Sequence, residues 1–216
     1  MIVKTTAEMK ALDRSAIEGR GIPSLQLMET AAHHVTDAVL AERADKTLPV
    51  LVFCGPGNNG GDGFACARQL LEAETSAKVC FVGDASKMTP DAKEECRRFT
   101  AAGGLVLPFC DFAAEPCSCA VDALFGVGLA REVRGAFAEA VRVINGLNAP
   151  VIACDIPSGI NGDTGEVMGT AVKAKKTVTF TCAKPGLLAG DGAVYAGELV
   201  IADIGIPQEL ILSPKA

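Results

Sequence analysis

The sequence has no tryptophan, one tyrosine and only two histidines, the adjacent His33 and His34, among its 216 residues. Its nine cysteines include no C-x-x-C pair, so the ligand pairs of a structural zinc site are missing. The cysteine count is odd, and Cys54, Cys80, Cys119, Cys154 and Cys182 fall within apolar runs. We therefore expect reduced, buried thiols and a cytoplasmic protein rather than a disulfide framework.

Positive charge is also scarce, since 20 lysines and arginines face 26 acidic residues, for a net charge of −6. Without a basic cluster the chain lacks the surface that neutralises nucleic-acid phosphates. No apolar run approaches the roughly 18–20 residues of a membrane span, and residues 1–8 lack the pattern of a signal peptide. We expect neither a nucleic acid nor a membrane as partner.

Apolar residues, by contrast, are plentiful at 49%, enough for one sizeable core, which favours a single domain over residues 1–216. Two helices are expected first, one beginning at the capping-box pattern of residues 5–8 and one over residues 25–39. Apolar runs then alternate with helical patterns, which predicts a three-layer, Rossmann-like α/β fold with a mostly parallel sheet and helices on both faces. The expected strands are residues 50–54, 79–82, 105–107, 119–124, 151–154, 177–180 and 199–201.

Ligands of such folds bind beyond the carboxyl ends of the strands. After the first strand, Gly55, Gly57 and Gly60 satisfy G-x-G-x-x-G, a pattern whose backbone N–H groups can hold a pyrophosphate. A nicotinamide-dependent dehydrogenase is one interpretation, with Asp84 after the second strand on the ribose hydroxyl. That interpretation leaves unexplained why the loop also carries Asn58, Asn59 and Asp62. Asn-Gly and Asp-Gly are also ordinary turn formers.

Two further strands carry aspartates near their carboxyl ends. Asp122 lies inside the apolar fourth strand, where a carboxylate needs a cation or several hydrogen bonds, and a glycine-rich turn with Arg131 and Arg134 follows it. Asp155 ends the fifth strand. If the two strands are neighbours, oxygens of Asn59, Asp122 and Ser158 form a low-charge site for a hard cation, for which we favour potassium. Asp155 is then free for acid–base chemistry, unless it only caps the following turn.

In their order and spacing these stretches resemble the YjeF N-terminal domain family, the NAD(P)H-hydrate epimerases, over nearly the whole chain. The resemblance rests on the opening helices with Asp13 and Leu27-Met28-Glu29, on the N-N-G-G-D-G stretch of residues 58–63, and on residues 122–135 and 155–165. The chain differs from the usual family pattern at Thr30, Ala32 and Val127.

The resemblance implies an isomerase of metabolite repair. Its substrate would be NADH or NADPH hydrated at C6 of the nicotinamide ring (NAD(P)HX), whose R and S forms it interconverts for an S-specific dehydratase. The resemblance also implies a homodimer and the following roles: catalysis by Asp155 and Asp122; potassium binding by Asn59, Asp122 and Ser158; and substrate binding by Asn58, Asn59, Gly60, Gly61, Asp62, Gly126, Val127, Gly128, Leu129, Ala130, Arg131, Glu132 and Asp155.

The preferred mechanism breaks the C6–O bond, because the ring nitrogen on the same carbon can expel the hydroxyl group as water and leave an iminium ion. Asp155 would protonate the departing oxygen and later activate water, and Asp122 would stabilise the cation directly or through its ion. Ring opening and reclosure is the alternative route. A non-catalytic dimerisation or binding scaffold is the alternative function, and whether Lys184 touches the ligand stays open.

Overall fold

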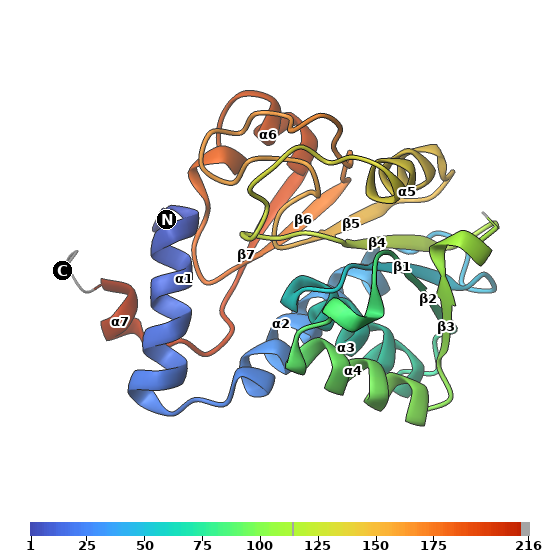
Figure 1. Ribbon diagram of the computed structural model, residues 1–216, viewed down its shortest axis with the longest axis horizontal. Helices are drawn as coiled ribbons and strands as arrows, with labels where there is room; N and C mark the ends of the chain where they lie inside the picture. Colours follow the sequence, from blue (N-terminus) through green and yellow to red (C-terminus); the bar gives the residue numbers. More distant parts are fainter. Residues whose placement is uncertain (114, 213–216) are drawn as a thin grey trace.

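The structure is a computed structural model that describes residues 1–113 and 115–212. Its centre is a seven-stranded sheet of order β3-β2-β1-β4-β5-β6-β7, in which every neighbouring pair is parallel (Figure 1). The strands are β1 (Val50–Cys54), β2 (Ala77–Phe81), β3 (Leu105–Pro108), β4 (Cys119–Ala123), β5 (Val151–Cys154), β6 (Lys176–Phe180) and β7 (Glu198–Ala202). All seven lie where the apolar runs predicted them, so the expected α/β architecture is confirmed.

Helices cover both faces of the sheet, as expected (Figure 1). On one face pack α2 (Ser24–Glu42), α3 (Asn58–Glu72) and α4 (Pro90–Ala101), and on the other lies α5 (Ala136–Gly146). Each face has its own core: Val35, Phe64 and Phe99 belong to the first, and Phe53 and Val141 to the second. Because helices cover both faces, every residue of the central strands β1, β4 and β5 is buried, rather than every second one.

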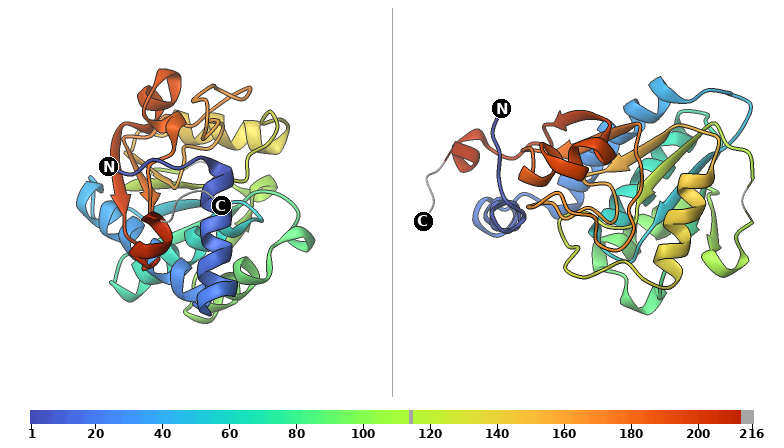
Figure 2. Two further views of the ribbon diagram at one scale, coloured as in Figure 1. Left: turned by 90° about the vertical axis from the view of Figure 1, so that its left-hand side faces the viewer. Right: turned by 90° about the horizontal axis from the view of Figure 1, so that it is seen from above.

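The remaining helices lie toward one end of the molecule, where both termini are also found (Figure 2). They are α1 (Thr6–Arg14), α6 (Gly190–Ala196) and α7 (Gln208–Leu212). The predicted capping box begins α1, since the Thr5 side chain accepts from the Glu8 backbone N–H and the Glu8 side chain accepts from the Thr5 backbone N–H. A π-helical turn, Ser15–Gly19, continues the helix.

The stretch after β1 differs from the sequence-based expectation. Residues 58–63 were expected to be a loop, yet α3 already begins at Asn58. The glycines permit this early start, because a Cβ at Gly60 would lie 1.8 Å from the Gly55 carbonyl oxygen, and one at Gly63 would lie 2.6 Å from the Cβ of Ala123. The first turns of α3 therefore pack directly on the ends of β1 and β4.

Cysteine burial also matches the expectation. Cys54, Cys80, Cys119, Cys154 and Cys182 are buried free thiols, and burial raises their pKa values above the ordinary range. Among residues 1–113 and 115–212, no helix is both long and apolar enough to span a membrane.

Candidate functional site

A cavity of about 490 Å³ opens at the carboxyl ends of β1, β4, β5 and β6. This is where the strand order reverses direction, since β1 continues to β2 on one side and the chain returns at β4 on the other. Ligands of open α/β sheets bind at such a switch point. The cavity is lined by Lys10, Asp13, Pro56, Gly57, Asn58, Asn59, Asp62, Leu124, Phe125, Gly126, Val127, Gly128, Asp155 and Phe180.

Asp155 follows directly after β5 and is only 6% exposed. Its backbone is left-handed, with φ of +67°, a conformation that costs a non-glycine residue on the order of 1–3 kcal/mol. The backbone N–H donates to the Val178 carbonyl oxygen at 2.8 Å, which holds that conformation in place. Such strain, maintained by its surroundings, is common at active sites.

Lys184 holds the Asp155 side chain. Its Nζ donates to Oδ1 of Asp155 at 2.5 Å, to the Thr179 hydroxyl at 2.8 Å and to the Phe180 carbonyl oxygen at 3.0 Å. Oδ2 of Asp155 accepts from the Val127 backbone N–H at 3.3 Å. Lys184, 1% exposed, thus directs all three ammonium protons to protein oxygens and does not line the cavity.

The strands that precede or carry the two aspartates are neighbours, the condition that the sequence analysis set for their convergence, because β4 and β5 pair with Asp122 opposite Ala153. Asp122 is nevertheless fully buried behind the cavity lining. Its Oδ1 accepts from the Ser158 hydroxyl at 2.6 Å, and its Oδ2 accepts from the Ser158 backbone N–H at 2.7 Å. Burial raises the pKa of Asp122 to about 6, although the Ser158 hydrogen bonds act in the opposite direction.

Gly126 lies between the side chains of Asn59 and Asp155. A Cβ at Gly126 would meet Oδ2 of Asp155 at 2.9 Å and Oδ1 of Asn59 at 3.0 Å, so only glycine fits between the two side chains. The Asn59 amide nitrogen is buried and has no hydrogen-bond partner in the part of the chain that the structure describes. An amide turned by 180° would place its oxygen at the same position, where a cation could satisfy it.

The predicted cation ligands therefore have the donor atoms that an oxygen-only cation site needs. Asp122, Ser158 and a turned Asn59 offer carboxylate, hydroxyl and amide oxygens, the donors that hard cations prefer. Among the described residues, no group of three or more His, Cys, Asp or Glu side chains is arranged to hold a metal ion. Any ion here would thus depend on neutral oxygens for most of its ligands.

The predicted substrate residues divide into three groups. Asn58, Asn59, Asp62, Gly126, Val127, Gly128 and Asp155 line the cavity. A neighbouring hollow of about 490 Å³, which shares Phe125 with the cavity, is lined by Leu129, Arg131 and Glu132, together with Phe125, Val133, Arg134 and Phe137. Gly60 and Gly61 are buried beneath the lining, and Ala130 is exposed and lines neither space.

Sequence analysis left the ligand contact of Lys184 open and assigned Asp13 no role in the site. Lys184 carried a signal, since a lysine amid the mostly apolar residues 180–188 needs a buried anion. Asp13 carried one too, because it follows Leu12 directly and Met9 by four positions, and both of those are buried. Asp13 reaches the cavity from α1, an element that belongs to none of the glycine-rich motifs after the strands.

Asp13 and Asp62 both have perturbed carboxyl groups. Burial and the charge of Asp155 together raise the pKa of Asp13 to about 6, against a lowering by the charge of Lys184. Burial, with the charges of Asp155 and Asp13, raises the pKa of Asp62 well above its usual range. Carboxyl groups with such shifts, gathered in one cavity, are typical of acid–base sites.

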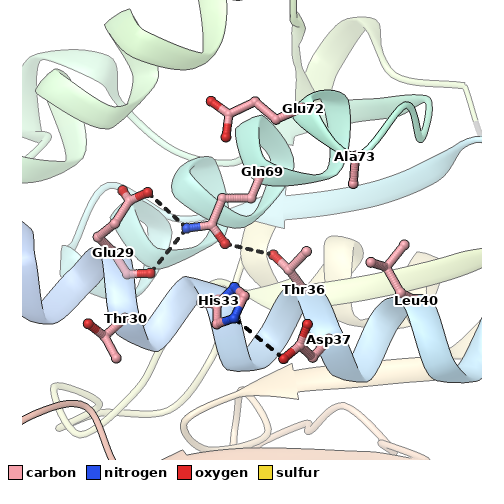
Figure 3. Close-up of a pocket in the computed structure, with 9 residues that line it drawn as sticks. All are labelled: Glu29, Thr30, His33, Thr36, Asp37, Leu40, Gln69, Glu72 and Ala73. Carbon is pink, nitrogen blue, oxygen red and sulfur yellow. Dashed lines mark hydrogen bonds and ion pairs between the residues drawn. The ribbon is translucent and has the colours of Figure 1, made fainter.

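A larger hollow of about 570 Å³ lies elsewhere, on the outer side of α2 and α3 (Figure 3). Its polar groups satisfy one another: the Gln69 amide donates to the Glu29 carbonyl oxygen at 3.1 Å and accepts from the Thr36 hydroxyl at 3.2 Å. Thr30 lies here rather than in the cavity, so its departure from the family pattern leaves the lining unchanged. This hollow shares no lining residue with the cavity at the strand ends.

Comparisons with known proteins agree with this geometry. An NAD(P)H-hydrate epimerase of Limosilactobacillus fermentum is 40% identical over 211 residues, covering 92% of this chain and 95% of that one. One of Limosilactobacillus reuteri is 42% identical over 202 residues, with 93% and 94% covered. A bifunctional NAD(P)H-hydrate repair enzyme of Thermofilum pendens is 40% identical and covers 98% of this chain, which spans 41% of that enzyme.

The crystal structure of the yeast protein YNL200c has the same architecture, with a TM-score of 0.76 at 26% identity over 86% of this chain and 83% of that one. The family profile described as YjeF-related protein N-terminus matches residues 24–186, a range that contains Asn59, Asp122, Asp155 and Lys184. With that profile covering most of the sequence, this chain belongs to the family of YjeF-related protein N-terminal domains.

Proposed function

We propose that this protein is an NAD(P)H-hydrate epimerase, an isomerase that interconverts the R and S forms of NAD(P)HX. The observation that carries the proposal is the strained, lysine-paired Asp155 in a cavity at the switch point of the sheet. That cavity is lined by the two motifs that follow β1 and β4. The relatives that cover nearly the whole chain at 40–42% identity carry the same enzyme name.

The nicotinamide end of the substrate would lie against Asp155, and the rest of the dinucleotide would extend over Phe125 into the neighbouring hollow. Arg131 and Arg134 line that hollow, and guanidinium groups suit phosphate oxygens. The first turn of α3, at Asn58 and Asn59, adds backbone N–H groups that no carbonyl of the same helix can accept from, and these also favour a phosphate. The nicotinamide ring thus lies against a carboxylate, and the phosphates lie near guanidinium and backbone N–H groups.

Epimerisation at C6 proceeds by loss of the hydroxyl group as water, formation of an iminium ion and return of water from the opposite face. The Asp155 carboxylate stabilises the positive ring, since it is a preorganised anion at the cavity wall. Asp122 acts from behind, as a positioning residue that fixes Ser158 and the turn after β5. This assignment gives Asp122 no direct contact with the substrate.

Potassium is the ion that we propose for Asn59, Asp122 and Ser158. Supporting it are the unpaired amide of Asn59 and the single formal charge of the set, which suits a monovalent ion. A bound cation would supply a fixed positive charge next to the glycine-rich turn after β4.

The dehydrogenase alternative needs Asp84 to bind a ribose hydroxyl. The Asp84 carboxylate instead accepts from the Ser86 backbone N–H at 2.9 Å and from the Ser86 hydroxyl at 2.7 Å. Asp84 caps a short 3-10 helix in this way. The scaffold alternative leaves the strain at Asp155 and its buried lysine partner without a purpose. Both alternatives are separated from the epimerase by one assay.

That assay follows the ratio of R to S NADHX by chromatography, in potassium buffer and in sodium buffer. Wild-type protein should accelerate the interconversion over the uncatalysed rate, and Asp155→Ala should abolish the acceleration. Folded wild-type protein without acceleration would refute the epimerase and favour the scaffold. Turnover in oxygen-labelled water tests the mechanism, because the iminium route exchanges the C6 oxygen with solvent. Full retention of the original oxygen would refute that route.

Three features of the biological setting are proposals as well. We propose a homodimer in the cytoplasm, working ahead of an S-specific dehydratase. The dehydratase partner is supported by relatives named bifunctional repair enzymes, of which this chain spans about two fifths. Sedimentation of the purified protein tests the dimer.

A further inference from the structure

The helix α1 is tied to the segments that follow β5 and β6. The Thr6 backbone N–H and hydroxyl donate to the two carboxylate oxygens of Asp163, each at 2.7 Å. Before the helix, Val3 pairs with Ala183 as a parallel bridge, and the Lys4 backbone N–H donates to the Ala183 carbonyl oxygen at 3.0 Å. Ala183 is the neighbour of Lys184, so α1 is fixed directly beside the Asp155–Lys184 pair.

This attachment presents Asp13 to the cavity. Met9, Leu12 and Ala16 bury one side of the helical segment, and Asp13 borders that side, half-buried. Asp13 lines both the main cavity and an adjoining hollow of about 130 Å³, which also share Asn58, Asp62 and Phe180. The π-helical turn that begins at Ser15 follows at once, a feature frequent at functional sites.

We propose that Asp13 is the proton-carrying catalytic residue of this enzyme: it protonates the departing C6 hydroxyl group and recovers the proton from the water that returns. The inference rests on the proposed function and assigns its acid. It replaces the expectation that Asp155 performs the proton transfers.

The step balances as follows. The Asp13 carboxylic acid gives its proton to the hydroxyl oxygen, the C6–O bond breaks with its electron pair going to oxygen, and water leaves. The ring nitrogen lone pair forms the C=N bond of the iminium ion. Water then attacks C6 from the other face, its electron pair forms the new C–O bond, the C=N electrons return to nitrogen, and the spare proton passes to the Asp13 carboxylate.

Asp155 is poorly suited to that role, because its oxygens already accept from the Lys184 ammonium, the Thr179 hydroxyl and the Val127 N–H. Such a set of donors fixes a carboxylate that stabilises charge. Asp13, in contrast, accepts no hydrogen bond from a cationic side chain among residues 1–113 and 115–212. A carboxylate fixed by a cation, next to a carboxyl group that no such cation binds, gives one site both an anion and an acid.

The surroundings of Asp13 favour a carried proton. Burial and the charge of Asp155 raise its pKa to about 6, against a lowering by Lys184. The other ionisable groups facing the two cavities are Asp62 from α3, Asp91 from α4 and Lys10 from α1 itself. A group with this pKa exchanges protons readily near neutral pH.

The test measures R-to-S conversion of NADHX between pH 5 and 8.5 for wild-type protein, Asp13→Asn, Asp13→Glu and Asp37→Asn, with the uncatalysed rate subtracted. Asp37→Asn is the matched control, since that carboxylate is 62% exposed on the outer side of α2. Asp13→Asn should lower kcat by roughly 100-fold or more with little change in KM, and Asp13→Glu should restore part of it. The wild-type kcat should fall as pH rises above about 6, and the Asn variant should lose that dependence.

A wild-type rate and pH profile in folded Asp13→Asn would overturn the inference and leave the epimerase standing. An inactive wild type would overturn both. If Asp13→Asn does not fold, carbon NMR titration of the wild-type Asp13 carboxyl decides instead: a midpoint near 6 supports the proposal, and one near the ordinary value of about 4 overturns it.

Discussion

The Nζ of Lys184 lies 2.5 Å from Oδ1 of Asp155, and both side chains are almost fully buried. The two residues come from different strand ends, Asp155 after β5 and Lys184 after β6. Their ion pair therefore joins two loops that together shape the cavity wall. Removing one partner of a buried pair leaves the other charge uncompensated, which is far costlier than losing a surface pair.

Lys184→Met should therefore destabilise the protein by about 3–5 kcal/mol and abolish the acceleration of NADHX interconversion. Urea unfolding followed by circular dichroism measures the first effect. Lys93→Met, at an exposed lysine of α4, is the control and should change stability by less than about 0.5 kcal/mol. Equal unfolding midpoints for the two variants would show that the Asp155 charge is satisfied by other groups.

Gly126→Ala should lose epimerase activity while the fold persists. A Cβ at Gly126 would sit within 3.0 Å of oxygens of both Asp155 and Asn59, so the methyl group must displace one of them. A displacement of about 1 Å at a reacting group costs on the order of 100-fold in rate. Gly146→Ala should keep wild-type activity, because among the described residues the added Cβ would meet nothing within 4 Å beyond its chain neighbours and the backbone of its own helix. Full activity in Gly126→Ala would place the reacting centre elsewhere.

Potassium should stabilise the wild-type protein more than sodium does at equal ionic strength. Binding to the folded state alone adds about 2.7 kcal/mol at a concentration 100 times the dissociation constant, and thermal unfolding detects such an effect. Asn59→Leu removes the amide oxygen while keeping similar volume, and it should remove the difference between the two salts. Identical melting curves of wild-type protein in both salts would refute potassium binding at this site.

Asp13→Asn should raise stability at pH 7.5. The folded-state pKa of Asp13 is about 6, above the ordinary value of 3.8, so the folded protein binds this proton more tightly than the unfolded chain. The stabilisation from this tighter proton binding is fully present below about pH 4 and is lost as pH rises through about 6. Asparagine avoids the buried charge, so we expect a gain on the order of 1–2 kcal/mol at pH 7.5 that disappears at pH 4. A gain independent of pH would mean that burial does not perturb Asp13.

The strands and the pairing of β4 with β5 could be predicted because apolar periodicity and right-handed parallel connections leave few arrangements. The start of α3 could not, since Asn and Gly favour turns locally and only the tight packing on Gly55 and Ala123 selects the helix. Lys184 lies 29 residues beyond Asp155, in the segment after β6, where no periodicity indicates which side chain it meets. The position of Asp13 depends on the hydrogen bonds between Thr6 and Asp163, which are 157 residues apart.

The spread of the site along the chain has a consequence for folding. The cavity draws on α1 at one end of the sequence and on β6 near the other, through contacts that close long loops. Loop closure on this scale is the slow part of forming parallel sheets. Enzymatic competence is therefore a property of the finished tertiary structure: no fragment holding only the first four strands, or only the last three, contains an active centre.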